Sequence, residues 1–422
     1  MSPLAALGGR PAIAAPLPAY PSIGPAEKAA VARVMEAGVL SGFHGVWGDR
    51  FDGGPEVRAL EAEWAARFGA RHVVSVNSAT SALVAAMGAI GLSPGDEVIL
   101  APTTMSATAM APLAYGGIPV FADIEAETFC LDPAAVAAAI TPRTRAILAT
   151  NLFGHPAALA QLRALADRHG IYLVEDNAQG PLAAEHGRLA GTIGHIGVFS
   201  LNYHKHIHAG EGGLCATADD GLALRLRLIR NHGENAVAPA GVADLTNMVG
   251  WNLRLSELHA AIARAQLAAI DGHVAARERI AARLSAGLSD LEGLAVPAVR
   301  AGCRHVYYVW AMQAGPALGI DRERFARGLK AEGFPCFTGY VAPLYRLPLF
   351  QQRRAIGRDG FPFTLGAPDY REGICPVAER LHRDSLIGFE PCAYDLDEAG
   401  VDRLVGAVRK VHAHRHELRA LN

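Results

Sequence analysis

The stretch RAILATNLFGHPAALAQLRALADRHGIYLVEDNAQG (residues 145–180) decides the fold class. It opens with RAILATN (145–151) and closes on IYLVED (171–176), two short and mostly aliphatic runs. Between them, AALAQLRALADRHG (157–170) places leucine and alanine at helical spacing and stops at a glycine, as an amphipathic helix does. Apolar strands that alternate with helices indicate a mostly parallel sheet covered on both faces.

The same alternation extends toward the N terminus. Helical spacing is found in PEVRALEAEWAARFG (55–69), and the β-branched run RHVVSVN (71–77) follows it. The sequence therefore predicts an α/β fold with a mostly parallel sheet flanked by helices. Further segments of this pattern are an Ala-rich helix at 78–92, strands at 96–102 and 118–124, and a short helix at 133–140.

A smaller domain is expected to follow. The residues LSELHAAIARAQLAAIDGHVAARERIAARLSAGL (255–288) predict a long helix interrupted at Gly272, where the alternation weakens. We therefore place a boundary near residue 270, between a large domain with an N-terminal arm (1–270) and a small α+β C-terminal domain (271–422). Within the small domain we expect a strand in 304–312, a helix at 321–333, a long Pro- and aromatic-rich stretch at 339–376 and a C-terminal helix.

Composition and charge exclude several classes of protein. The 422 residues contain 39 Lys plus Arg and 41 Asp plus Glu, so no net field attracts nucleic acid or an anionic membrane. The six cysteines are scattered without a C-x-x-C pair, which argues against a zinc ribbon or a disulfide scaffold and for reduced thiols in a cytoplasm. The first residues lack a basic n-region, and no run of eighteen apolar residues lacks Gly, Pro and charge. We therefore expect neither a signal peptide nor a membrane span.

The segment NSATSAL (77–83) joins a predicted strand to a predicted helix through small hydroxylated residues. Backbone N–H groups and the helix dipole at such a junction suit a phosphate, and Ala79 leaves room for close approach. The simpler explanation is that Ser78 or Thr80 only caps the helix. Alone, this segment does not choose between a ligand and a cap.

Two further motifs bring reactive groups to one sheet edge. Asp176 ends the strand 171–176, where ligands bind in open α/β sheets, and its carboxylate could hold a metal, cap a loop or pair with a protonated ring nitrogen. The predicted strand GVFSLN (197–202) carries Ser200 and Lys205 to the same edge. A lysine for a Schiff base, a carboxylate that keeps a pyridine nitrogen protonated and a helix start for a phosphate are the parts that pyridoxal 5'-phosphate requires.

Motifs in register over nearly the whole chain resemble the pyridoxal-phosphate sugar aminotransferases of the DegT/DnrJ group. The resemblance runs from about Leu4 to the C terminus and implies the fold type I of these transferases. The motifs that carry it are GPEVRALEAEWAARFG, NSATSAL, PGDEVILAP, IPVFADI, LDPAAVAAAITPRTRAI, LFGHPA, VEDNAQ, FSLNYHKHIHAGEGG, RNHGE and GWNLRLSELHAAIARAQL, with YVAPLYRLPLF and CPVAERLH in the second domain.

The resemblance implies roles for five residues around the cofactor ring. Lys205 would form the Schiff base, with Ser200 on the phosphate and Glu211 beside them. Asp176 would pair with the pyridine nitrogen, and Gln179 would lie near the ring hydroxyl. Lys205 and Asp176 are therefore the predicted catalytic residues.

The resemblance also implies contacts from more distant segments. Residues 78–80 match the family's phosphate loop, with alanine in place of the usual glycine. Met105 stands where many members stack an aromatic ring on the cofactor, and a thioether can pack against a ring. Asn252 matches an asparagine that reaches the phosphate of the neighbouring subunit, so the active sites would be shared across a homodimer.

Three histidines surround the predicted catalytic lysine and raise an alternative. On a strand, His204, His206 and His208 would share one face, and imidazole is a common metal ligand. No cluster of cysteine or carboxylate at ligand spacing accompanies them. If Lys205 forms the Schiff base, the alternation reflects an extended loop, and the histidines contact neighbouring groups or substrate hydroxyls.

The sequence therefore predicts an aminotransferase that moves an amino group from glutamate or glutamine to a keto group of a sugar nucleotide or cyclitol. Lys205 would hold the cofactor and then act as general base and acid, for which its amine must be neutral. One alternative is a sugar dehydratase of the same superfamily, in which histidine replaces the lysine. Another is a non-catalytic regulator or metal-binding protein on the same fold, against which the intact Ser200, Asp176 and Lys205 argue.

Overall fold

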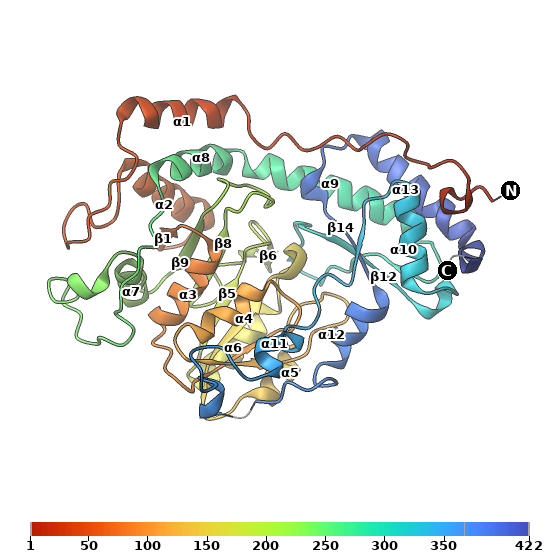
Figure 1. Ribbon diagram of the computed structural model, residues 1–422. Helices are drawn as coiled ribbons and strands as arrows, with labels where there is room; N and C mark the ends of the chain where they lie inside the picture. Colours follow the sequence, from red (N-terminus) through yellow and green to blue (C-terminus); the bar gives the residue numbers. More distant parts are fainter. Residues whose placement is uncertain (1, 367, 421–422) are drawn as a thin grey trace.

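A seven-stranded sheet lies at the centre of the molecule (Figure 1), in a computed structural model that describes residues 2–366 and 368–420. The strands from β8 to β3 run parallel to one another, and β9 pairs antiparallel with both β8 and β1. The prediction of a mostly parallel sheet is therefore confirmed. In spatial order the strands are β1 (His72–Val76), β9 (Gly213–Thr217), β8 (Ile196–Ser200), β5 (Tyr172–Asp176), β4 (Thr144–Thr150), β2 (Glu97–Leu100) and β3 (Ile118–Phe121).

Helices flank this sheet, as the alternating pattern predicts. Helix α6 (Leu159–His169) lies between β4 and β5 in the chain and ends at Gly170, whose φ of 63° forms the left-handed cap that glycine favours. The strands themselves are almost entirely buried, which agrees with a sheet covered on both faces. The other helices of this layer are α2 (Pro55–Phe68), α3 (Ala79–Ala89), α4 (Ser106–Leu113), α5 (Pro133–Ala139), α7 (Asp220–Arg230) and α8 (Glu257–Ala268).

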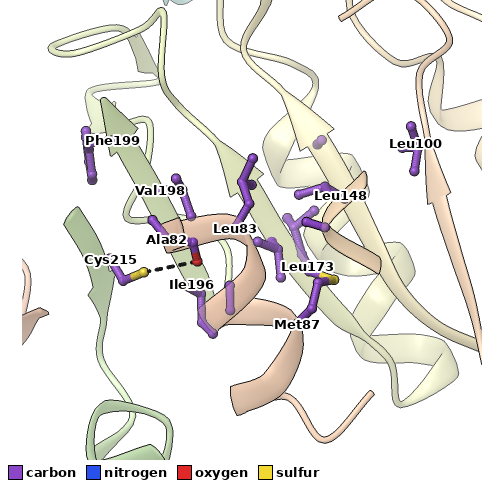
Figure 2. Close-up of a cluster of buried hydrophobic side chains, with 14 of the residues drawn as sticks. Ala82, Leu83, Met87, Leu100, Leu148, Leu173, Ile196, Val198, Phe199 and Cys215 are labelled. Carbon is purple, nitrogen blue, oxygen red and sulfur yellow. Dashed lines mark hydrogen bonds between the residues drawn. The ribbon is translucent and has the colours of Figure 1, made fainter. Parts of the chain in front are cut away.

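Helix α3 packs on the sheet beside β8 and β9. Leu83 and Met87 belong to the same buried cluster as side chains from β2, β4, β5, β8 and β9 (Figure 2). The Cys215 thiol of β9 donates a hydrogen bond of 3.4 Å to the carbonyl oxygen of Ala82. This packing fixes the first turn of α3 next to the carboxyl end of β8. The strand residues labelled in the cluster are Leu100, Leu148, Leu173, Ile196, Val198, Phe199 and Cys215.

A second, four-stranded antiparallel sheet forms beyond the central one. It has the order β10-β12-β14-β13 and shares a separate buried cluster with helices α9 (Ile270–Leu288), α10 (Arg322–Ala331) and α13 (Glu398–Ala413). Its strands are β10 (Leu294–Ala295), β12 (Trp310–Ala314), β14 (Leu386–Phe389) and β13 (Phe337–Thr338). A small third sheet contains β11 (Cys303–Arg304), β6 (Ala184–Glu185) and β7 (Arg188–Leu189).

The domain boundary near residue 270 stays a prediction. Side chains from Val306 and from the segment 344–386 pack in the buried cluster of the central sheet, although they follow that boundary in the chain. The segment 339–376 contains only short helices, among them α11 (Pro348–Gln351), and residue 367 within it lies outside the described residues. Tyr370 anchors it by donating a hydrogen bond of 2.7 Å to the carbonyl oxygen of Pro119 in β3. Helix α12 (Pro376–Arg380) follows.

The long helix predicted at 255–288 is broken three residues earlier than expected. Its two halves, α8 and α9, meet at Ala269, which has φ −101° and ψ 0°. Gly272 continues α9, and no atom outside its helix lies within 4 Å of an added Cβ. An exposed glycine lowers helix stability by only about 1 kcal/mol, so the surrounding packing can override it. The strand predicted within 304–312 also begins later, at Trp310, because Tyr307 adopts a positive φ of 51°.

The N-terminal segment passes α13 and α9 before the chain enters α1 (Pro25–Ala37), which packs on α8 (Figure 1). The Ile13 N–H donates to Glu332 O at 2.9 Å, and the Tyr20 N–H donates to Ala393 O at 3.0 Å. These backbone bonds hold the segment beside the end of α10 and the loop that follows β14. In the part of the chain that the structure describes, every helix is too short or too polar to cross a membrane.

Candidate active site

The predicted residues gather around one cavity of about 200 Å³ at the carboxyl ends of β5 and β8. Asp176 is the last residue of β5 and pairs with Val198 of β8, which ends two residues later at Ser200. The loop after β8 brings Lys205 back to this edge. Eight of the nine predicted cofactor residues line the cavity: Ser78, Ala79, Thr80, Met105, Asp176, Gln179, Ser200 and Lys205.

Asp176 is buried and held by two hydrogen bonds. Thr108 Oγ1 donates to Asp176 Oδ2 at 2.7 Å, and the Ala178 N–H donates to Oδ1 at 3.2 Å. Burial raises the pKa of Asp176, while these bonds and the charge of Lys205 oppose the rise. A cationic partner in the cavity would therefore be favoured beside this carboxylate.

Thr108, which donates to Asp176, is itself linked to two further threonine hydroxyls. Thr150 Oγ1 donates to Thr104 Oγ1 at 3.1 Å, and Thr104 and Thr108 hydroxyls lie 3.1 Å apart. Sequence reasoning missed these three residues. Thr104 and Thr108 are four residues apart at the start of α4, so their helical spacing was an available signal. Thr150 ends β4 and pairs with Asp176 of β5, so its place at a strand end was also an available signal.

Glu175, the neighbouring carboxylate, faces away from the cavity. Its oxygens accept hydrogen bonds from the backbone N–H groups of Gly191, Ile193 and Gly194, at 2.6 to 2.8 Å. Successive strand residues point to opposite faces, which separates the two acids. Glu175 therefore fixes the loop after β7, and Asp176 alone of this pair faces the site.

Lys205 lines the cavity beside Tyr308, which precedes β12 in the chain. Its Nζ is 4.4 Å from the ring centroid of Tyr308, which is a cation–π distance. Burial lowers the pKa of Lys205 to about 8, although the nearby Asp176 and Glu390 charges act to raise it. About a tenth of this amine is therefore neutral at pH 7, far more than for an ordinary lysine, and the neutral form is the one that accepts a proton. Sequence reasoning also missed Tyr308.

The first turn of α3 forms the end of the cavity opposite the lysine loop. Ser78 caps this helix by accepting a hydrogen bond of 3.0 Å from the Ser81 N–H. The simpler explanation of this motif, a helix cap, is thus correct, and the same turn also lines the cavity. β9 approaches the turn closely: a Cβ on Gly213 would lie 2.5 Å from the Ser78 carbonyl carbon and 2.6 Å from the Ala79 nitrogen.

Gln179 connects the cavity wall to the segment that follows β13. Its Oε1 accepts from the Phe153 N–H at 2.7 Å, and its Nε2 donates to Tyr340 Oη at 3.1 Å. Tyr340, another lining residue that sequence reasoning missed, comes from the segment after β13. Glu211 accepts a 3.0 Å bond from Asn202 Nδ2, whose own Oδ1 is buried without a partner among the described residues.

Met105 and Asn252 are predicted cofactor residues that the structure leaves exposed, and the three histidines do not all face the cavity. Met105 is 58% exposed at the cavity rim, and Asn252 is exposed and does not line the cavity of its own chain. His204 lines the cavity, whereas His206 is buried and bonds Val306 O through Nε2 at 2.7 Å. In residues 2–366 and 368–420, no three His, Cys, Asp or Glu side chains are grouped to hold a metal ion.

The donor set of this cavity fits pyridoxal phosphate. A buried carboxylate, Asp176, suits a protonated ring nitrogen, and the Lys205 amine suits an aldehyde. The N–H groups at the start of α3 and the Ser200 hydroxyl suit a phosphate. The cavity contains all of these groups together.

Comparison with known proteins gives a consistent result. The model of the DegT/DnrJ/EryC1/StrS aminotransferase family matches residues 45–386. The chain is 34% identical to an L-glutamine:2-deoxy-scyllo-inosose aminotransferase from Streptomyces kanamyceticus, and the alignment covers 99% of each protein. It is 35% identical to a dTDP-3-amino-3,4,6-trideoxy-alpha-D-glucose transaminase from Streptomyces venezuelae, with 93% of each covered.

The fold matches solved aminotransferase structures as well. An aminotransferase from Psychrobacter cryohalolentis superimposes with a TM-score of 0.82 at 28% identity, and the match covers 95% of this chain and all of the other. The predicted fold type I is therefore confirmed.

Proposed function

The protein belongs to the DegT/DnrJ/EryC1/StrS aminotransferase family, and we propose that it transfers the amino group of glutamine or glutamate to the keto group of a cyclitol or sugar nucleotide. The observation that carries the proposal is the single cavity in which Lys205, Asp176 and the first turn of α3 meet. Pyridoxal phosphate is the proposed cofactor, because its three recognition groups match these three features. When bound, it supplies an electron-accepting ring beside the substrate carbon.

Different residues of the chain would have different roles in the reaction. Asp176 would keep the ring nitrogen protonated, and the hydrogen bond from Thr108 would hold that carboxylate ionised and aligned. Lys205 would hold the cofactor covalently and, once released by the amino donor, would move a proton through Nζ. Its lowered pKa of about 8 supports this second task. The first turn of α3 and Ser200 would bind the phosphate.

In this proposal Lys205 supplies the reactive nitrogen, and the neighbouring histidines do not. His206 and His208 are buried outside the cavity, and His204 stands beside Lys205 with a pKa that burial lowers to about 4. This arrangement favours the aminotransferase over a dehydratase that would use histidine in place of the lysine. Its relatives' names include both cyclitol and sugar-nucleotide substrates, so both acceptor classes stay in the proposal.

A homodimer with shared sites is also proposed. Asn252 lies on the chain surface next to the exposed Trp251, and the apolar side chains of Val46, Leu245 and Val249 are at least 60% exposed. Exposed apolar groups of this size support burial against another subunit. In such a dimer Asn252 would be free to reach the partner's phosphate site. The six free cysteines support a reducing, cytoplasmic location.

The test uses the purified full-length protein with pyridoxal phosphate. We expect a visible absorbance band, and we expect glutamine or glutamate to change it in a single half-reaction. Adding 2-deoxy-scyllo-inosose or a dTDP-linked keto sugar should then restore the band. A protein that binds no cofactor, or whose band responds to no amino donor, would contradict the proposed function.

A further inference from the structure

A second cavity, of about 190 Å³, adjoins the catalytic lysine. It shares Lys205, His204 and Tyr308 with the cofactor cavity and extends toward the N-terminal segment. The walls of this adjoining cavity include Tyr20 and Ser22 from the N-terminal segment, Tyr203 from the lysine loop and Glu390 from the end of β14. A ligand there would stand next to the reactive nitrogen.

The N-terminal wall of the adjoining cavity is held in place. Besides the Tyr20 backbone bond to Ala393, the Asp395 N–H donates to Pro18 O at 3.0 Å. The guanidinium of Arg277 lies 3.8 Å from the Tyr20 ring centroid, and the Tyr20 hydroxyl bonds His273 Nδ1. These contacts fix the ring as a flat wall. The Ser22 hydroxyl has no hydrogen-bond partner among the described residues and stays available to a ligand.

Glu390 supplies an unpaired negative charge. Its side chain is exposed and makes no hydrogen bond or ion pair within the described part of the chain. Its charge nevertheless acts on Lys205, whose pKa it raises, so the carboxylate and the reactive amine are near one another. Pro391 follows it directly and restricts the backbone at the turn after β14.

The charges around this cavity select against an anion. Lys205 is the only Lys or Arg among its described lining residues, and the pKa of His204, lowered to about 4, leaves that ring neutral. A phosphate or carboxylate placed here would meet Glu390 without a spare cation. A carboxylate only accepts hydrogen bonds, so it suits a ligand rich in hydroxyl donors, and aromatic faces suit the C–H groups of a ring.

We propose that this adjoining cavity binds the ring of the keto acceptor as an uncharged polyol, with Glu390 accepting hydrogen bonds from its hydroxyls. This inference rests on the proposed function and assigns Glu390 as a residue that recognises the acceptor. The amino donor, which carries an α-carboxylate, gains nothing from Glu390. Glu390 therefore acts in the acceptor half-reaction and not in the donor half-reaction.

The experiment separates the two half-reactions in the cofactor-loaded enzyme. Glu390→Gln keeps the side-chain size and removes the charge, and the cofactor band reports each half-reaction in stopped flow. With 2-deoxy-scyllo-inosose or the dTDP-linked keto sugar, whichever the wild type accepts, the apparent Kd should rise about tenfold or more. The rate with glutamine should change by less than about twofold.

Three further variants make the result specific. Glu390→Asp should restore part of the acceptor affinity, and Ser22→Ala should weaken it without altering the donor step. Glu36→Gln, which removes an exposed carboxylate on α1 outside this cavity, should match the wild type in both half-reactions.

The proposal is overturned if Glu390→Gln leaves the acceptor Kd unchanged, or if the donor step weakens as much as the acceptor step. Should Glu390→Gln lose its cofactor band, Ser22→Ala decides alone, and an unchanged acceptor Kd in that variant overturns the proposal. A wild-type protein without any cofactor band contradicts the proposed function instead, so the two failures can be told apart.

Discussion

Thr108 Oγ1 donates a 2.7 Å hydrogen bond to Asp176 Oδ2, and this bond links the start of α4 to the carboxyl end of β5. The Asp176 carboxylate is buried, and burial alone favours its protonated form. The bond from Thr108 opposes that effect because it stabilises the ionised form. An Asp176 carboxylate that pairs with a ring nitrogen must stay ionised, so the proposed catalysis depends on this contact.

Replacing the carboxylate should separate cofactor binding from chemistry. We expect Asp176→Asn to retain pyridoxal phosphate, because Lys205 and the first turn of α3 remain, but to slow the half-reaction with glutamine by about 10²-fold or more. A neutral amide cannot stabilise a protonated ring nitrogen. Stopped-flow absorbance measures the rate. An unchanged rate would remove Asp176 from the proposed role.

Removing the threonine hydroxyl should have a smaller effect that depends on pH. Thr108→Val loses the hydrogen bond that lowers the Asp176 pKa, so this pKa rises and the acid limb of the pH–rate profile moves to higher pH. At neutral pH the rate should fall roughly tenfold, since a bond to a charged group is lost. The matched control is Thr103→Val, because the buried Thr103 hydroxyl has no partner among the described residues. An equal shift in both variants would mean that the Thr108 bond is not the cause.

Removing Lys205, the proposed catalytic lysine, should leave the fold intact. Lys205→Ala should abolish turnover and the covalent link, while circular dichroism stays that of the wild type. The cofactor should still bind reversibly through the phosphate and Asp176 contacts, and dialysis should then remove it faster. Lys28→Ala, on the exposed surface of α1, is the control. Wild-type turnover by Lys205→Ala would contradict the assignment of the lysine.

The sheet and the residues at its edge could be predicted because strand periodicity determines which ends meet. Asp176 and Ser200 each end a parallel strand, and parallel strands bring their carboxyl ends to one edge. Tyr308 and Glu390 could not be predicted in this way, since they reach Lys205 only through the packing of the small sheet on the large one. The helix break predicted at Gly272 was wrong, because packing outweighs the low helix propensity of a single glycine.

The close approach of β9 to α3 should make Gly213 intolerant of substitution. A methyl group there would lie 2.5 Å from backbone atoms of Ser78, so Gly213→Ala must displace the first turn of α3. Overpacking of this kind costs about 1–3 kcal/mol, and the displaced turn should also weaken cofactor binding. Thermal unfolding with and without cofactor measures both effects.

A second glycine gives the matched control for that substitution. Gly272 lies in α9 with open space around its missing Cβ, so Gly272→Ala should raise the free energy of unfolding by about 0.5–1 kcal/mol without changing cofactor affinity. If Gly213→Ala were destabilised but bound the cofactor as well as the wild type, the first turn of α3 would not be the phosphate site.

The proposed dimer makes a prediction about which subunit supplies Asn252. This residue is exposed and lies outside the cavity of its own chain, so a contact with phosphate requires the partner's site. A hydrogen bond to a charged phosphate contributes about 1.5–3 kcal/mol, so Asn252→Ala should weaken cofactor retention roughly tenfold or more. Equilibrium dialysis measures this loss. Asn247→Ala is not a suitable control, because the Asn247 side chain donates a hydrogen bond of 2.7 Å to Leu92 O.

Mixing the two variants at a cofactor concentration too low to fill the Asn252→Ala site, so that neither is active alone, tests the subunit origin directly. Chains with Lys205→Ala are combined with chains with Asn252→Ala under conditions that exchange subunits. If Asn252 acts across the interface, a mixed dimer has one site with both changes and one site with neither, so mixing restores activity. If Asn252 acts within its own chain, every site keeps one change and no activity returns. That second outcome would leave Asn252 as an ordinary loop residue and would remove the reason for a shared active site.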